Sequence, residues 1–125
     1  MKTLDGINIW NRSCDLAIQT NRTLHGCHDS GFRNLVTQAS LAIASNVAAG
    51  YERDSQTQCR RFLENAKGAC AELRTQLYIA GELGIIDNGQ SIDLIAESLK
   101  ISSMLQGLLN NHPKKTQPKP TPNST

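Results

Sequence analysis

Hydrophobic residues recur at steps of three and four along most of the chain, the spacing of one face of an α-helix. The first such segment runs from about residue 5 to 24. Its stripe follows Ile7, Trp10, Cys14, Ala17, Asn21 and Leu24. A second segment spans about residues 31–49 and is rich in small side chains. Its stripe follows Phe32, Leu35, Ala39, Ile43, Asn46 and Gly50. Gly26 is typical of a helix stop, and Asp29 or Ser30 can cap the second start.

The third segment has the clearest start, because Ser55 and Gln58 match a capping box. It runs from about residue 56 to 83, and Gly84 is the expected stop. Its buried face is expected to hold Cys59, Phe62, Ala66, Ala69, Leu73, Leu77 and Ala80. Gly68 inside this helix costs about 1 kcal/mol relative to Ala unless close packing requires it.

The fourth segment follows the turn signal at residues 87–89, takes Ser91 as its cap and extends to about residue 110. One face follows Ile92, Ile95, Leu99, Ser102, Leu105 and Leu109. A second apolar strip beside it holds Leu94, Ile101, Met104 and Leu108. So wide an apolar surface indicates either contact with another subunit or a deep position in the core.

No stretch alternates as a strand does, so four helices with short connections predict an all-α fold, an antiparallel up-down four-helix bundle. We expect it to occupy residues 1–111. Residues 112–125 hold all four prolines and Lys114, Lys115 and Lys119, a composition that predicts a disordered tail.

Composition narrows the class of protein. Of 125 residues, 38% are hydrophobic, and no run approaches the ~18 apolar residues of a membrane span. No secretory signal is visible at the start, so we expect a cytoplasmic protein without membrane contact. Removing the three tail lysines from thirteen basic residues leaves ten against eleven acidic ones, so the mild basicity belongs to the tail.

Two stretches resemble a known family. Residues 38–53 read QASLAIASNVAAGYER, and residues 61–79 read RFLENAKGACAELRTQLYI. Together they resemble the bacterial 23S rRNA intervening-sequence proteins, with departures at Gln38, Ala42 and Ala49. The resemblance implies an antiparallel bundle that assembles as a homo-oligomer, commonly a pentamer, with no known reaction. Related bundles are accessory proteins of diversity-generating retroelements, in which a basic ring works with a reverse transcriptase and its RNA.

The third helix and the turn before it carry the candidate binding residues. Five cations there suit contacts with phosphates of RNA or DNA: Arg53, Arg60, Arg61, Lys67 and Arg74. Repetition of these charges around a ring would multiply weak contacts. Glu64 and Glu72 lie at helical spacing from several of them, so pairing within the helix competes with this role. The alternative is an ordinary solvated surface of mixed charge.

Asn46 falls on the expected buried stripe, where an amide needs hydrogen-bond partners. Glu72 and Gln76, one turn apart on the third helix, can supply them, which predicts a structural polar network. The cluster of His25, Cys27 and His28 fits the ligand spacing of a zinc site poorly. We therefore expect no metal, no cofactor and no catalytic site, since no nucleophile–base motif is present either.

The sequence thus favours a non-enzymatic, cytoplasmic, homo-oligomeric helical bundle. It would act as an accessory or scaffold protein that binds nucleic acid and a reverse transcriptase through a basic face. The alternative is a purely structural protein–protein interaction module without a nucleic-acid role.

Overall fold

The computed structural model describes residues 4–111, which form four helices and no strand. These are α1 (Leu4–Thr23), α2 (Ser30–Tyr51), α3 (Gln56–Glu82) and α4 (Asn88–Asn111). The predicted all-α fold is confirmed, and the order of the four helices is the one expected. The expected tail at 112–125 lies outside the described residues.

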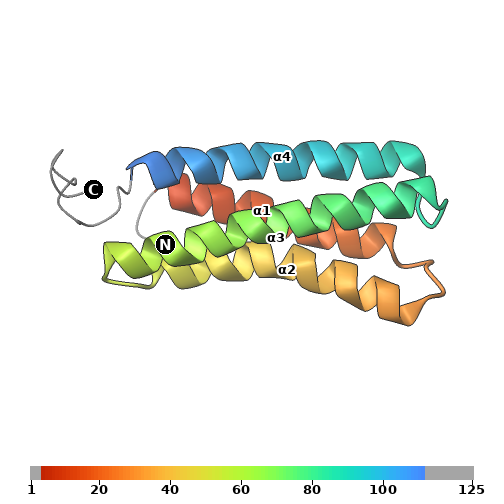
Figure 1. The fold of residues 1–125 in the computed structure, drawn as a ribbon, viewed down its shortest axis with the longest axis horizontal. Helices are drawn as coiled ribbons and strands as arrows, with labels where there is room; N and C mark the ends of the chain where they lie inside the picture. Colours follow the sequence, from red (N-terminus) through yellow and green to blue (C-terminus); the bar gives the residue numbers. More distant parts are fainter. Residues whose placement is uncertain (1–3, 112–125) are drawn as a thin grey trace, which may run out of the picture.

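The helices form an elongated bundle in which consecutive helices run in opposite directions (Figure 1). Each helix packs against two neighbours, α1 against α2 and α4, and α3 against the same two. The diagonal pairs make no close backbone contact within residues 4–111. The α2–α3 turn and the end of α4 therefore lie at one end of the bundle. The α1–α2 connection and the α3–α4 turn lie at the other.

Side-chain caps fix three of the helix starts. Asp29 Oδ1 accepts from the Phe32 N–H at 3.0 Å, and Ser55 Oγ accepts from the Gln58 N–H at 3.3 Å. Both match the sequence. At α4 the expected cap at Ser91 is wrong, because Asp87 accepts from the Gln90 N–H and the helix begins at Asn88. Ser91 is instead buried.

The end of α3 is a Schellman motif that requires glycine. Gly84 has φ +72°, a left-handed conformation that other residues rarely adopt. The Ile85 N–H donates to the Ala80 carbonyl at 2.9 Å, and the Gly84 N–H donates to the Gly81 carbonyl at 3.2 Å. The chain is thereby turned sharply into α4, as the position of Gly84 predicts.

The core matches the predicted stripe best in α3 and least in α1 and α4. Apart from half-buried Phe62, every predicted core residue of α3 is buried. In α2, Leu35 is exposed, whereas Val36 and Val47, which widen the predicted stripe, are fully buried. In α1 the predicted stripe is offset, since the buried face holds Gly6, Ile9, Ser13, Leu16, Ala17 and Thr20. In α4, Ile92 and Leu99 are exposed, and the second strip provides much of the core.

Buried hydroxyl residues explain these offsets. Ser13 and Ser98 are fully buried, as are Thr20 and Ser40. Ser13 Oγ donates to the Ile9 carbonyl at 2.7 Å, and Ser91 Oγ donates to the Leu77 carbonyl of α3 at 2.7 Å. A small hydroxyl that donates to a backbone carbonyl is tolerated in a core. Sequence periodicity counts such positions as polar and so assigns them to the surface.

An ion pair links α1 to α4, the first and last helices of the bundle. The Arg12 guanidinium donates through Nε and Nη2 to the two carboxylate oxygens of Glu97, at 2.8 and 3.0 Å.

Between residues 4 and 111, no helix has the length and hydropathy that a membrane crossing demands.

Candidate functional site

Three of the five predicted cations line the side of α3 that faces α4. Arg60 donates to the Leu109 carbonyl at 2.7 Å and pairs with Glu64 on its own helix at 2.9 Å. Lys67 donates to Gln106 Oε1, and Arg74 donates to Ser98 Oγ at 3.3 Å. All three are half-buried. Their hydrogen-bonding capacity is therefore partly used in holding α3 to α4.

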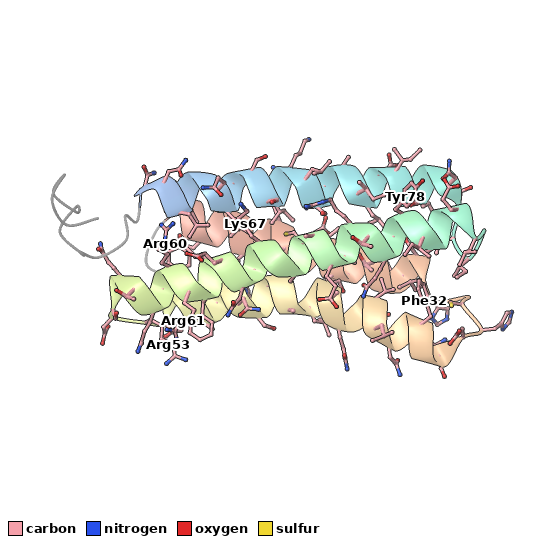
Figure 2. All side chains as sticks on the ribbon, in the orientation of Figure 1. Phe32, Arg53, Arg60, Arg61, Lys67 and Tyr78 are labelled. Atoms are coloured by element: carbon pink, nitrogen blue, oxygen red, sulfur yellow. The ribbon has the colours of Figure 1, made fainter. Side chains whose placement is uncertain are left out.

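The other two cations lie elsewhere. Arg53, which follows α2, and Arg61 are exposed near the α2–α3 turn, away from Arg60 and Lys67 (Figure 2). The Arg53 guanidinium lies over the Phe62 ring, 4.9 Å from its centroid. The five residues thus form two groups rather than one basic face.

The predicted polar network does not form among the described residues. Asn46 Nδ2 donates to the Ala42 carbonyl of its own helix at 2.8 Å. Glu72 is exposed, and Gln76 Oε1 is buried without a hydrogen-bond partner. The helix register explains why. A Cβ on Gly50 would lie 3.2 Å from Phe62 Cβ, so Asn46 is level with about residue 65, roughly 10 and 16 Å along α3 from Glu72 and Gln76.

The histidine–cysteine cluster does not gather either. His25 and His28 are exposed, while Cys27 is buried and its thiol donates to the Asp29 carbonyl at 3.5 Å. Within residues 4–111 no three potential ligands come together as a metal site, and the four cysteines are free thiols.

The most distinctive surface feature is an apolar groove between α1 and α2, which the sequence did not identify. Its walls are Trp10, Ile18 and Leu41, with exposed fractions of 38, 48 and 51%. Small residues form much of the rest: Cys14, Ala17, Ala44, Ser45 and Ala48. The groove has a volume of about 690 Å³, and of the described residues that line it Arg22 alone is charged.

The thiol of Cys14 belongs to this groove. It is half-buried, and burial raises the pKa of the Cys14 thiol above its ordinary value of 9.0. The side chain therefore stays uncharged at neutral pH and adds to the apolar lining. We call the groove that these residues line, Trp10, Cys14, Ile18 and Leu41 among them, the α1/α2 groove.

A second apolar surface lies along α3 and α4. Tyr78, Ile92 and Leu99 have exposed fractions of 61, 57 and 51%. Leu99 shares a helix face with Gln106, which receives the hydrogen bond from Lys67, so Leu99 lies on the α3 side of α4. Tyr78 shares a helix face with Arg74, which donates to Ser98 of α4. Figure 2 shows Tyr78 on the side of α3 next to α4. We call Tyr78, Ile92 and Leu99 the α3/α4 patch.

These surfaces hold part of the surplus of apolar positions in the sequence, while Leu4, Leu35 and Leu83 are exposed outside both of them. Buried serines and a threonine occupy core positions in α1 and α4, and larger apolar side chains face outward. The sequence signal was present in the two apolar strips of the fourth helix. Which strip is buried is decided by packing against the neighbouring helices, and periodicity does not contain that information.

The fold defines the class of protein as an antiparallel four-helix bundle. A model of the family described as 23S rRNA-intervening sequence protein matches residues 5–107, and the chain belongs to this family. The resemblance seen in the sequence is thereby confirmed.

A solved structure shows the same fold. It is a member of the S23 ribosomal protein family from Bacteroides thetaiotaomicron, described as a protein with unknown function. The two superpose with a TM-score of 0.75 over 81% of this chain and 97% of the other, at 13% sequence identity. A comparison with curated proteins finds no match.

Proposed function

We propose that this protein is a non-enzymatic, cytoplasmic, homo-oligomeric scaffold, and that its principal working surface is apolar. The observation that carries the proposal is the α1/α2 groove, in which Trp10, Ile18 and Leu41 remain about half exposed in the isolated chain. Covering such a surface with another protein removes apolar area from water, which is favourable by about 25 cal/mol for each Å² that becomes buried.

The distribution of charge supports a protein–protein role. Three of the five candidate cations engage α4 or Glu64, which lowers their capacity to bind an external phosphate. Among the groove-lining residues that the structure describes, one is charged. A bundle of this size also buries a limited share of its surface alone, so association adds to its stability. The ring of five implied by the family resemblance is the assembly we propose.

Light scattering at micromolar concentration tests this proposal. We expect a particle several times the 13.7 kDa of one chain. Ile18→Asp, which places a carboxylate in the groove without touching the core, should dissociate it. Leu35→Asp is the matched control, because Leu35 is similarly exposed on α2 but outside the groove. A single-chain particle for the unmodified protein would contradict the proposal.

A second function is favoured by a separate observation. Arg53 and Arg61 are exposed at the end of the bundle where α4 ends. The chain continues from there into a sequence with Lys114, Lys115 and Lys119. These charges favour contact with RNA or DNA, alone or beside a reverse transcriptase. Binding of structured RNA and of DNA at two salt concentrations tests this role, and the absence of binding at low salt would exclude it.

A further inference from the structure

We infer that successive copies of this chain pack side by side and point in the same direction, with the α1/α2 groove of one copy receiving the α3/α4 patch of the next. The inference rests on the proposed homo-oligomer and adds which two surfaces meet and in which direction. The groove is concave with small residues along it, whereas Tyr78, Ile92 and Leu99 project from the surface of α3 and α4.

Charge at the rims determines the direction. Arg22 lines the groove in the last turn of α1, and Glu82 is the last residue of α3. Both are exposed, and both lie at the same end of the bundle because α1 and α3 run in the same direction (Figure 1). Copies that point the same way therefore bring Arg22 of one to Glu82 of the next. Groove against groove would offer Arg22 no carboxylate from the lining, since none of the residues between 4 and 111 that line the groove is acidic.

The apolar side chains then fall into register. Ile18 precedes Arg22 by four residues, and Tyr78 precedes Glu82 by four. Alignment of the two charges thus puts Ile18 level with Tyr78. One turn earlier, Cys14 is level with Arg74. The hydrogen bond between Arg74 and Ser98 places the adjacent residue Leu99 at that level too. Leu99 therefore enters the groove beside Cys14, between Trp10 and Ile18.

Such a contact is heterologous, because each copy uses two different surfaces. Repetition of a heterologous contact yields a closed ring or an open filament rather than a two-fold dimer. The segment 112–125 is a poor alternative occupant, because it contains no large apolar residue to fill the groove.

Disulfide trapping tests the pairing. In Leu99→Cys, oxidised with copper–phenanthroline under mildly alkaline conditions that increase the thiolate fraction, we expect the introduced thiol of one copy to link to Cys14 of the next. Since every copy carries both thiols, non-reducing electrophoresis should show a ladder extending beyond dimers. The ladder should disappear in Leu99→Cys/Cys14→Ala. It should also be absent in Gln38→Cys, an exposed position of α2 outside the groove.

A charge swap covers the case in which Leu99→Cys itself prevents assembly. Arg22→Glu and Glu82→Arg should each weaken assembly roughly tenfold, and the double variant should restore it. A particle that is oligomeric by light scattering but gives no ladder and no charge-swap rescue would overturn the pairing of the groove with the patch and leave the proposed homo-oligomer standing. So would dimers linked through Cys14 alone in the unmodified protein. A single-chain particle would overturn the proposed homo-oligomer itself.

Discussion

At the scale of single residues, two glycines of α3 differ in what surrounds them. A Cβ on Gly81 would lie 2.8 Å from Ser91 Oγ and 3.0 Å from Ser91 Cβ. Ser91 is buried and held by its bond to the Leu77 carbonyl, so it has little room to yield. We expect Gly81→Ala to lower the free energy of unfolding by about 1–3 kcal/mol, measured by urea denaturation at fixed protein concentration.

Gly68 is the matched control. It is exposed within the same helix, and apart from the adjacent residues and the backbone of its own helix no atom lies within 4 Å of the position its Cβ would take. Gly68→Ala should therefore raise the free energy of unfolding by about 0.5–1 kcal/mol. Equal effects of the two substitutions would contradict the packing described for Gly81.

Cys70 predicts a loss of stability at alkaline pH. Burial raises the pKa of its thiol from 9.0 to about 11, although Arg74 and Lys67 oppose the shift. Between pH 9 and 11 the unfolded chain loses this proton and the folded chain keeps it, so stability falls as pH rises. The group should contribute about 2–3 kcal/mol below pH ~9, and this contribution should vanish by about pH 11. Urea unfolding of the unmodified protein and Cys70→Ala measures it as their pH-dependent difference. A difference that stays constant across this pH range would refute it.

At the scale of helices, the sequence predicted existence and order well and orientation unevenly. Caps at Asp29 and Ser55 and the stop at Gly84 are local signals, and each predicts its boundary correctly. Orientation depends on neighbours. The predicted stripe through Ile7 and Trp10 is more apolar than the true core face of α1, which contains Ser13 and Thr20. For the same reason the sequence identified the candidate cations but not their separation into two groups, which the α3–α4 hydrogen bonds determine.

A charged pair between α1 and α4 adds to the apolar packing of these two helices. Arg12 and Glu97 are partly exposed, at 41 and 30%, so solvent screens their attraction. A double-mutant cycle with Arg12→Ala and Glu97→Ala should give a coupling energy of about 0.5–1 kcal/mol, which falls when salt is raised. Additive single effects at low salt would show that the pair contributes no stability.

At the scale of the whole molecule, substitutions in the two groups of cations should have different effects. Those in one group should mainly lower stability, and those in the other should mainly weaken nucleic-acid binding. Arg60→Ala/Arg74→Ala removes bonds from α3 to α4, so it should lower the urea midpoint and alter RNA affinity little. Arg53→Ala/Arg61→Ala removes exposed charge near the α2–α3 turn together with the contact of Arg53 with the Phe62 ring, so it should reduce RNA affinity more than it lowers the urea midpoint. In a ring, each substitution is repeated in every copy that contacts the same RNA, so the decrease in affinity should exceed that of one site.

The salt dependence of RNA binding supplies the decisive measurement. For each phosphate that a variant no longer neutralises, the slope of log K against log salt should become shallower by about 0.7–0.9. We expect this change for Arg53→Ala/Arg61→Ala and an unchanged slope for Arg60→Ala/Arg74→Ala at matched folded fraction. If Arg60→Ala/Arg74→Ala changed the slope and Arg53→Ala/Arg61→Ala did not, RNA would bind along the side of α3 that faces α4. RNA would then compete with the bonds that hold α3 to α4, and binding it would loosen the bundle instead of leaving it intact.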